Sequence, residues 1–273
     1  MAREPQVPVA YYRYHSGGWE RVEAHLVREM PVTLLVNGET WLTWMCTPTN
    51  LEDLAVGFLY NEGLISGLDE IAALSACESG EFVDVWLNHA LTRPNTWKRT
   101  SGCSGGMTAA LGNLVPIPIQ EEKRLQPEMI LDQAQLLLQA QALYRLTGGV
   151  HSSILSDGQH ILAQAEDIGR HNTLDKIAGR CLAEGLQGRA RFLVTTGRIS
   201  SEMLQKAARM QVPVVISRTS PNSLSVQMAC SLGITLIGYS RRDQFQVYSH
   251  PERIEGVPQA AAVSWVECLE GVP

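Results

Sequence analysis

The stretch from residue 191 to 248 constrains the fold most, because short apolar runs alternate there with segments of helical character. RFLVTTG, VPVVISR and ITLIGYS are continuous in apolar residues, RISSEMLQKAARMQ and TSPNSLSVQMACSLG lie between them, and FQVYS follows as a last strand. Strands that are apolar throughout and are joined through helices are typical of a parallel sheet covered on both faces. The sequence therefore predicts an α/β fold for this part of the chain.

Arginine side chains follow the expected strands of this sheet at their carboxyl ends. Arg198 follows the first strand, Arg218 the second, and Arg241 and Arg242 the third. Open parallel sheets bind ligands at that edge, where the free amides of helix N-termini favour anions. Two interpretations stay open: a pocket for a phosphate-bearing ligand, or arginines that neutralise acidic residues on a solvated rim. Neither GxxxxGK[ST] nor GxGxxG occurs, so the standard nucleotide-binding loops are missing.

The first hundred residues predict a small α+β unit. Two β-rich runs meet at Asn37-Gly38, a strong hairpin signal, and FVDVWL predicts a further strand. Between them, TPTNLEDLAVGFLYNEGLI predicts a helix with Asn50 as its N-cap. Residues 1–25 and 255–273 show no pattern that predicts an element.

The middle of the chain predicts two helices separated by a hairpin. PEMILDQAQLLLQAQALYRL places Pro127 at the first helical position, and TGG ends this helix. HSSILSDGQHILAQA predicts a hairpin with a DG turn, and NTLDKIAGRCLAEG predicts a helix that Asn172 caps and Gly185 closes. The apolar face of the first helix would carry Ile130, Ala134, Leu137 and Leu138.

Composition and charge narrow the class of protein. The chain has 273 residues, of which 45 % are hydrophobic and 18 % charged, and this is typical of a folded protein with a sizeable core. A net charge of −6 argues against a general affinity for nucleic acid or for an anionic membrane. The N-terminus lacks the apolar core of a signal peptide, and no apolar run has the length of about eighteen residues that spans a membrane. We therefore expect a cytoplasmic protein with reduced thiols.

Cys103 stands apart from the other cysteines, because serine and glycine surround it in TSGCSGGM. Lys98 and Arg99 would lower the pKa of this thiol, and if MTAALGNL begins a helix, the N-terminus of that helix would lower it further. The glycines would let the thiol reach two partners. The alternative is a tight turn that holds an inert cysteine. No CxxC pair occurs, so a zinc knuckle is not expected. The other five cysteines have apolar neighbours and are interpreted as small core residues: Cys46, Cys77, Cys181, Cys230 and Cys268.

Two histidines lie at expected element boundaries. His171, in EDIGRHNTLDK, and His151, in TGGVHSS, are each interpreted either as structural residues or as an acid, base or ligand contact. Metal binding is a poor interpretation of both, because no second ligand stands at helical or turn spacing.

Several of these segments together closely resemble the FdhD family, the formate dehydrogenase accessory sulfurtransferases. The resemblance rests on TGGVHSS, EDIGRHNTLDKIAG, TTGRISSEMLQKAA, VVISRTSPNSLSVQMACSLGITLIGY and FQVYSHPERI, with TPTNLEDLAVGFLYNEGLI and TSGCSGG in the N-terminal half. It implies an α/β fold, namely a cytidine-deaminase-like α/β/α sandwich over residues 116–273. A smaller N-terminal α+β domain would span residues 1–115 and end in the Cys103 loop.

The resemblance also implies a function. Family members take sulfur from a cysteine desulfurase as a cysteine persulfide and pass it to the molybdenum or tungsten of a bis-molybdopterin guanine dinucleotide cofactor destined for formate dehydrogenase. The persulfide cysteine corresponds to Cys103, and a homodimer without a tightly bound metal of its own is expected. The cofactor-contacting segment corresponds to Tyr239, Ser240, Arg241, Arg242, Asp243 and Gln244.

One departure from the family pattern bears on the chemistry. The family loop is usually C-G-x-C-G, whereas Gly106 stands here in place of the second cysteine. Release of sulfur from Cys103 would then need direct attack by the acceptor or by an outside thiol. A non-catalytic chaperone that only binds and delivers the cofactor is an alternative. A zinc nucleobase deaminase is disfavoured, because neither an H-x-E nor a PCxxC motif occurs.

Overall fold

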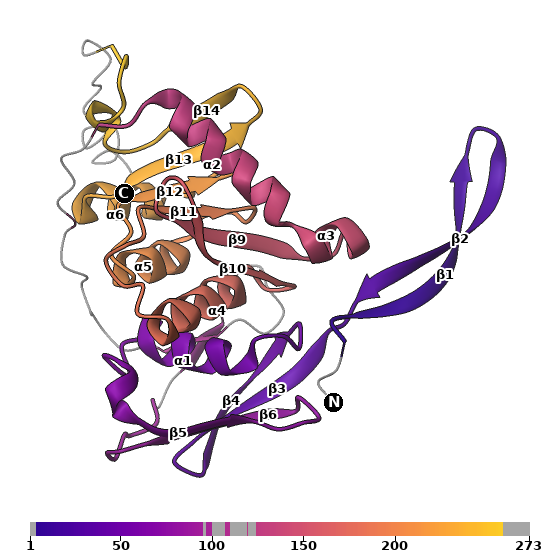
Figure 1. The fold of residues 1–273 in the computed structure, drawn as a ribbon, viewed down its shortest axis with the longest axis vertical. Helices are drawn as coiled ribbons and strands as arrows, with labels where there is room; N and C mark the ends of the chain where they lie inside the picture. The colour runs from indigo at the N-terminus through magenta and orange to yellow at the C-terminus, as the bar shows by residue number, and fades with distance from the viewer. Residues whose placement is uncertain (1–3, 95–96, 100–106, 110–118, 120–123, 259–273) are drawn as a thin grey trace.

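Two sheets and a projecting ribbon organise the chain (Figure 1). The computed structural model describes residues 4–94, 97–99, 107–109, 119 and 124–258. One sheet has six strands in the order β10-β9-β11-β12-β13-β14, and the other has four in the order β4-β3-β6-β5. The prediction of a cytidine-deaminase-like fold and of a domain boundary near residue 115 remains a prediction.

The six-stranded sheet confirms the predicted alternation but is mixed rather than parallel. Its parallel centre consists of β11 (Phe192–Thr195), β12 (Val214–Ser217) and β13 (Thr235–Arg241). The flanking strands are antiparallel: tight hairpins join β9 (His151–Ser156) to β10 (Ile161–Asp167) and β13 to β14 (Gln244–Val247). Strand β9 also pairs antiparallel with β11. The carboxyl ends of β10, β11, β12 and β13 therefore meet at one edge of the sheet, whereas β9 and β14 run the other way.

Helices cover both faces of this sheet. On one face lies α2 (Pro127–Ala140), followed by the short α3 (Ala142–Thr147). On the other lie α4 (Arg170–Ala183), α5 (Ser201–Arg209) and α6 (Ser223–Leu232). Because side chains alternate along a strand, Phe192 and Val194 join the core under α2 while Leu193 joins the core under the other helices.

Three details of these helices differ from the sequence-based expectation. The single helix predicted over residues 127–146 is interrupted at Gln141, so α2 ends at Ala140 and it is α3 that ends at the Gly148 of TGG. Asn172 does not cap α4, which begins earlier with Gly169 as N-cap; the Asn172 amide instead donates to Asp167 and to the Met45 carbonyl. Leu138, which was expected on the buried face of α2, is only half-buried, whereas Gln133 is buried. The side-chain nitrogen of Gln133 donates to the carbonyl of Gly158. Two predicted boundaries are confirmed: Pro127 is the first residue of α2, and Gly185 follows α4 with a positive φ of 64°.

The four-stranded sheet forms the N-terminal half of the body. It contains β3 (Met30–Val36), β4 (Glu39–Cys46), β5 (Ile71–Ala76) and β6 (Phe82–Leu87), with the turn η1 (Leu68–Glu70) before β5. Asn37 and Gly38 both have positive φ between β3 and β4, which confirms the predicted hairpin. Helix α1 (Leu51–Asn61) covers one face of the sheet. Asn50 precedes α1 in a left-handed conformation without a side-chain cap, contrary to expectation.

Helix α1 packs directly on α4 and so joins the two halves (Figure 1). A Cβ atom on Gly57 of α1 would lie 1.8 Å from the carbonyl oxygen of Asp175, and one on Gly179 of α4 would lie 2.0 Å from that of Asp53. The two backbones therefore touch at glycine. Beside this contact, the buried Lys206 ammonium pairs with Asp175 at 2.7 Å and with Glu62 at 3.1 Å.

A second buried ion pair ties the β4–α1 loop to α4. The Lys176 Nζ lies 2.6 Å from an Asp167 carboxylate oxygen, and both side chains are at most 1 % exposed. The same ammonium donates to the Thr47 carbonyl at 2.9 Å and to the Thr49 hydroxyl at 3.2 Å, while Asp167 accepts from the Thr47 amide. These polar groups satisfy one another across the junction between the halves.

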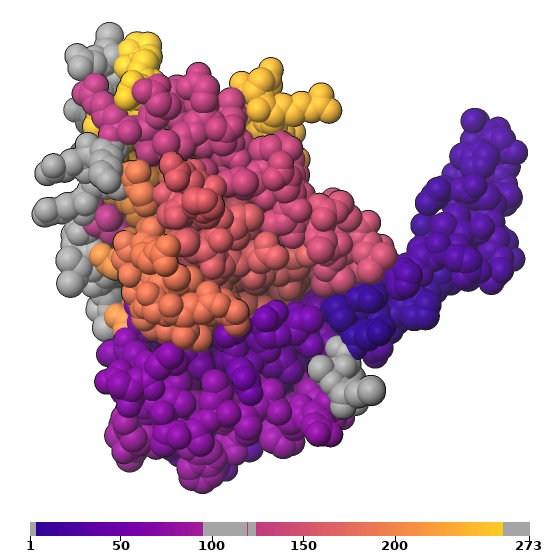
Figure 2. Space-filling view, in the orientation of Figure 1, coloured from indigo at the N-terminus to yellow at the C-terminus, as the bar shows by residue number. Residues whose placement is uncertain are grey.

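The N-terminal residues form an element that the sequence analysis missed. Strands β1 (Gln6–His15) and β2 (Gly18–Val27) pair over their full length as a two-stranded ribbon that projects from the body (Figures 1 and 2). Tyr and Val in YYRYHSGGWERVE, with Gly-Gly in the middle, carried the signal for this hairpin. Across the described ranges, no helix is long and apolar enough to cross a membrane.

Candidate functional site

The C-terminal segment of β13 forms one wall of a hollow of about 670 Å³ at the edge where the parallel strands end. Arg218, which follows β12, joins this wall, and α2 forms the opposite wall with Asp132 and Gln135. Three guanidinium groups thus face two carboxylates, which leaves the hollow positively charged. We call it the strand-end hollow; its strand side is lined by Arg218, Ser240, Arg241, Arg242, Asp243 and Gln244.

The backbone of this segment departs from a regular strand. The register between β13 and β14 shifts between Gly238 and Arg241, which marks an irregularity of the bulge type. Tyr239 has a φ of 50° and Arg242 a φ of 41°, in the left-handed region that glycine tolerates and that bulky side chains rarely adopt. Such strain clusters at functional positions in proteins.

Ser240 gives the hollow an unsatisfied polar atom. The side chain is only 1 % exposed, and its Oγ has no hydrogen-bond partner within the part of the chain that the structure describes. A buried hydroxyl without a partner costs about 1–3 kcal/mol, so a ligand oxygen in the hollow would stabilise it. Tyr239 is set back from the hollow: its ring stacks beside Arg241, with 5.9 Å between the ring centroid and the guanidinium carbon.

The structure separates Arg198 from the other strand-end arginines. Arg198 lines a smaller hollow of about 130 Å³ between the N-termini of α5 and α6, together with Arg170 at the start of α4. The N-caps of α5 and α6, Ser200 and Asn222, also line it. Because Arg218 and Pro221 belong to one loop but line different hollows, the two hollows flank the β12–α6 loop.

The two histidines lie at the same edge of the sheet. His171 is buried, and burial together with Lys206 and Arg170 lowers its pKa to about 2, so its imidazole is neutral. Its Nε2 lies 3.5 Å from the Ser200 hydroxyl. Burial and Arg170 also lower the pKa of His151, whose Nδ1 lies 3.3 Å from the Thr196 hydroxyl. Within the described residues, no group of three or more His, Cys, Asp or Glu side chains is arranged to hold a metal ion.

Cys103 lies outside the described residues. The strands on either side of it in the sequence, β7 (Trp97–Arg99) and β8 (Met107–Ala109), pair antiparallel. The expectation of a helix beginning at Met107 is therefore wrong, because these residues pair as a strand instead.

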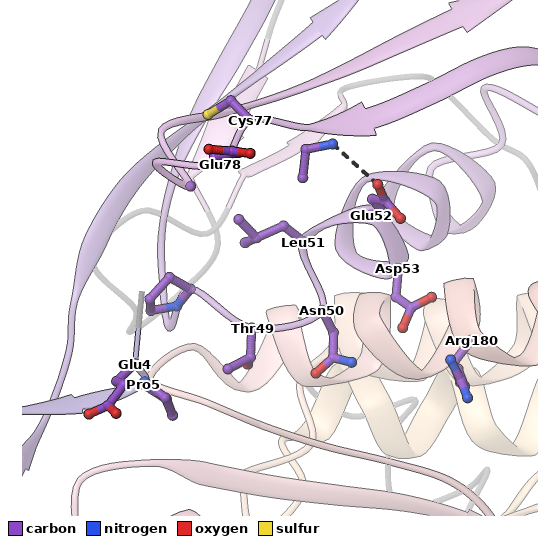
Figure 3. Close-up of a pocket in the computed structure, with 13 residues that line it drawn as sticks. Glu4, Pro5, Thr49, Asn50, Leu51, Glu52, Asp53, Cys77, Glu78 and Arg180 are labelled. Atoms are coloured by element: carbon purple, nitrogen blue, oxygen red, sulfur yellow. Dashed lines mark hydrogen bonds between the residues drawn. The ribbon is translucent and has the colours of Figure 1, made fainter. Parts of the chain in front are cut away.

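Cys77 differs from the core residue that its neighbours predicted. It lies in the turn after β5, and its sulfur accepts from the amides of Glu81 at 3.1 Å and Phe82 at 3.2 Å and contacts the Ser79 hydroxyl at 3.3 Å. Burial alone would raise the pKa of Cys77, but the Ser79 hydroxyl and the backbone amides outweigh it and lower the pKa. The side chain lines a hollow of about 860 Å³, with Arg180 and Asp53 across it (Figure 3).

Sequence reasoning missed two parts of the candidate site. The α2 wall of the strand-end hollow carries Asp132 and Gln135, whose positions along a helix give no sign of the strand edge that they face. Arg170 was not assigned to a pocket, although it stands beside His171 at the start of a helix that follows a strand end, and that position is a usable signal.

Comparison with known proteins shows the family of this chain. Residues 27–255 match the model of the FdhD/NarQ family. The Sulfur carrier protein FdhD of Bacillus subtilis is 40 % identical over 249 residues, which cover 89 % of this chain and 95 % of that protein. The Sulfur carrier protein FdhD of Staphylococcus aureus strain MRSA252 is 38 % identical over 248 residues, or 89 % and 94 %.

A solved structure shows a similar fold. The crystal structure of a protein described as a formate dehydrogenase accessory protein, from Desulfotalea psychrophila, superposes with a TM-score of 0.75 at 27 % identity, covering 92 % of this chain and 100 % of that one. The family match and the identities to its named members extend over most of the chain, through both sheets and the strand-end hollow. The chain belongs to the FdhD/NarQ family.

Proposed function

We propose that this protein carries sulfur to the molybdenum cofactor of formate dehydrogenase and binds that cofactor at the strand-end hollow. The names of its relatives, sulfur carrier proteins and a formate dehydrogenase accessory protein, support the sulfur and dehydrogenase parts of the proposal. The observation that carries it is that Arg218, Arg241 and Arg242 line one hollow at the carboxyl edge of the parallel strands together with Ser240, whose buried hydroxyl has no partner among the described residues.

The chemistry of the hollow suits a guanine nucleotide bearing a pyrophosphate. Guanidinium groups bind phosphate oxygens in pairs of parallel hydrogen bonds, and the Ser240 hydroxyl can donate one more. Asp243 supplies a carboxylate acceptor of the kind that pairs with the guanine N–H groups. Bis-molybdopterin guanine dinucleotide carries two such nucleotides, and the second arginine-lined hollow, with Arg198 and Arg170, lies on the other side of the β12–α6 loop.

Cys103 carries the sulfur in this proposal. Its thiolate attacks the terminal sulfur of a desulfurase persulfide, so a new S–S bond forms on Cys103 while the donor S–S bond breaks and the donor cysteine leaves as a thiolate. The terminal sulfur then passes to the metal of the cofactor: the S–S bond breaks, its electron pair stays on Cys103 as a thiolate, and the metal supplies the two electrons that convert the transferred sulfur to sulfide. Because Gly106 replaces the second loop cysteine of the family pattern, the acceptor or an outside thiol makes the releasing attack.

The partners in this proposal are a cysteine desulfurase, which donates the sulfur, and formate dehydrogenase, which receives the cofactor. A cytoplasmic location and a homodimer complete the proposal.

Calorimetric titration with guanosine diphosphate tests the binding site. Replacing Arg242 with glycine removes one guanidinium group, and we expect the dissociation constant to rise about 10- to 100-fold, as for the loss of one charge-assisted contact. Since glycine tolerates the φ of 41°, the same variant should unfold at a slightly higher temperature, which separates lost binding from lost folding. Arg189→Ala, at an exposed position before β11 at the opposite edge of the sheet, is the control. Equal affinities of Arg242→Gly and the parent protein would refute the site.

Mass spectrometry tests the sulfur chemistry. After incubation with a cysteine desulfurase and cysteine, the peptide that contains Cys103 should gain the mass of one sulfur atom, and dithiothreitol should remove it. The Cys103→Ala variant should bind guanosine diphosphate normally but fail to restore formate dehydrogenase activity in cells that lack the parent gene. Full restoration by Cys103→Ala would instead support a chaperone that binds and delivers the cofactor without carrying sulfur.

A further inference from the structure

The ribbon of β1 and β2 stands clear of the body along most of its length (Figures 1 and 2). Its strands pair from Gln6–Val27 at the base to His15–Gly18 at the tip, and they form a sheet of two strands. The base is fixed by the Arg28 amide, which donates to the Pro5 carbonyl at 2.7 Å, and by packing of β2 on α3. An isolated two-stranded hairpin is marginally stable in water, so the rest of the ribbon lacks the support that such an element needs.

One face of the ribbon is apolar over three successive cross-strand pairs. Directly opposite residues share a face in an antiparallel pair. One face carries the Arg13–Glu20 ion pair near the tip of the ribbon, and between this pair and the base it carries aliphatic and aromatic side chains. Tyr11 is 40 % exposed and Leu26 is 51 % exposed. The other face is apolar only near the tip, where it carries Tyr12, Tyr14 and Trp19, and it is polar at His25 and Glu23 nearer the base. We call this the apolar face; its residues are Val7, Leu26, Val9, Ala24, Tyr11 and Val22.

The charges of the ribbon argue against a strongly charged partner. Arg13 pairs with Glu20 at 3.1 Å and Arg21 with Glu23 at 2.8 Å, so two cations and two carboxylates cancel within the ribbon. Nothing on it would steer a nucleic acid, an anionic membrane or an acidic protein. Its attraction for a partner is therefore the burial of apolar surface.

The area of the ribbon favours a second copy of this chain. Ten residues extend about 33 Å, and two strands with their side chains are about 10 Å wide, so one face offers only a few hundred Å². A stable interface buries about 800 Å² on each partner, which a single ribbon on a foreign protein does not reach. In a two-fold pair each copy gives a ribbon and receives one, so the buried area doubles.

The same chain also offers an apolar surface that can receive a ribbon. Phe82 and Trp86 on β6 are 42 % and 47 % exposed, although α1 covers the other face of that sheet. We infer that the ribbon is an exchange arm, which lies in solution with its apolar face on a second copy of this chain. Family resemblance predicts a homodimer; the arm assigns to it an interface built from residues 6–27.

Sedimentation of the full chain at micromolar concentration tests this assignment. The parent protein should sediment as a dimer, and Val9→Glu, which places a carboxylate in the apolar face twice per dimer, should raise the dimer dissociation constant by ~100-fold or more. His25→Glu is the matched control, since His25 lies on the opposite face of the same ribbon, and it should remain a dimer. A monomeric parent protein, or a Val9→Glu variant that dimerises as tightly as the parent, would overturn the inference.

Hydrogen exchange gives a second readout that does not depend on sedimentation. In the parent dimer the amides of residues 9–11 should exchange slowly, and in Val9→Glu they should exchange at least tenfold faster. The amides of Phe192–Val194 at the centre of the six-stranded sheet should stay equally protected in both, which shows that the body remains folded. Rapid exchange in the ribbon of the parent protein would show that nothing covers it.

Discussion

Replacing Gly57 with alanine should destabilise the protein, although alanine favours an isolated helix by about 1 kcal/mol. The added methyl carbon would lie 1.8 Å from the Asp175 carbonyl oxygen and 2.6 Å from the Gly179 nitrogen, both backbone atoms of α4. Ordinary contact needs about 3.4 Å, so α1 and α4 must separate by more than 1 Å, which loosens the packing around them. Overpacking with a side chain that can yield costs about 1–3 kcal/mol, and backbone atoms yield less. We expect a net loss of about 2–4 kcal/mol.

Urea unfolding followed by circular dichroism measures this loss. Gly67→Ala is the control, because its new methyl carbon would meet only the Asp69 carboxylate, which can rotate away. Gly179→Ala should behave like Gly57→Ala, and the double variant should cost less than the sum, because the first substitution already separates the helices. A Gly57→Ala variant as stable as the parent protein would show that the helices adjust freely and that the close contact is not a constraint.

Three further results are expected. The folded state holds His171 neutral, whereas the unfolded chain binds a proton on it below about pH 6.5, so the free energy of unfolding falls by about 1.4 kcal/mol per pH unit below that value. His171→Gln should remove about 2 kcal/mol of the loss between about pH 6.5 and about pH 5.0. Urea unfolding at these two pH values measures the difference. A pH dependence that His171→Gln leaves unchanged would contradict this. Lys176→Met should cost about 3–5 kcal/mol because it leaves the buried Asp167 unpaired, and adding Asp167→Asn should recover part of it; a double variant no more stable than Lys176→Met would argue against the ion pair. Iodoacetamide should label Cys77 at neutral pH far faster than Cys46, since burial and Asp167 raise the pKa of Cys46 to about 12; peptide mapping that finds equal rates would contradict the lowered pKa of Cys77.

Local signals predicted much of the fold from sequence, and the failures have physical reasons. Continuous apolar runs between helical segments located β11, β12 and β13, because a strand buried on both faces has little room for polar residues. The hairpin of β9 and β10 was predicted from its DG turn and is confirmed, whereas the antiparallel pairing of β9 with β11 joins strands that are distant in the sequence, and no local pattern encodes it. The β1–β2 ribbon was missed because Pro8 and the consecutive Ala10, Tyr11 and Tyr12 interrupt the alternation in β1, although residues 22–26 of β2 alternate between apolar and polar.

The candidate site was predicted in part. Strand-end position alone located Arg218, Arg241 and Arg242, and the structure brings these three together. Arg198 has the same position after its strand but lines another hollow, because the direction of a side chain depends on the loop that carries it. Cys77 was interpreted as a core residue from its neighbours, although the turn after it directs backbone amides at the sulfur. Contacts of this kind depend on loop conformation, which composition does not determine.

Two of the six non-glycine residues with positive φ in the described part of the chain, Tyr239 and Arg242, lie close together in the segment that lines the strand-end hollow. Gln211 and His250 also have positive φ, but they stand singly, after α5 and before the turn at Pro251–Arg253. Asn37 and Asn50 also have positive φ, but asparagine tolerates that region, and Asn37 shares its turn with a glycine, so folding alone accounts for them. Tyr239 and Arg242 have no such reason, because glycine would serve a bulge or a two-residue turn better at either position. The same six-residue segment also holds the unsatisfied Ser240 hydroxyl. Two strained residues and one unpaired hydroxyl each lower stability, and a bound anion held by Arg241, Arg242 and Ser240 would offset all three at once.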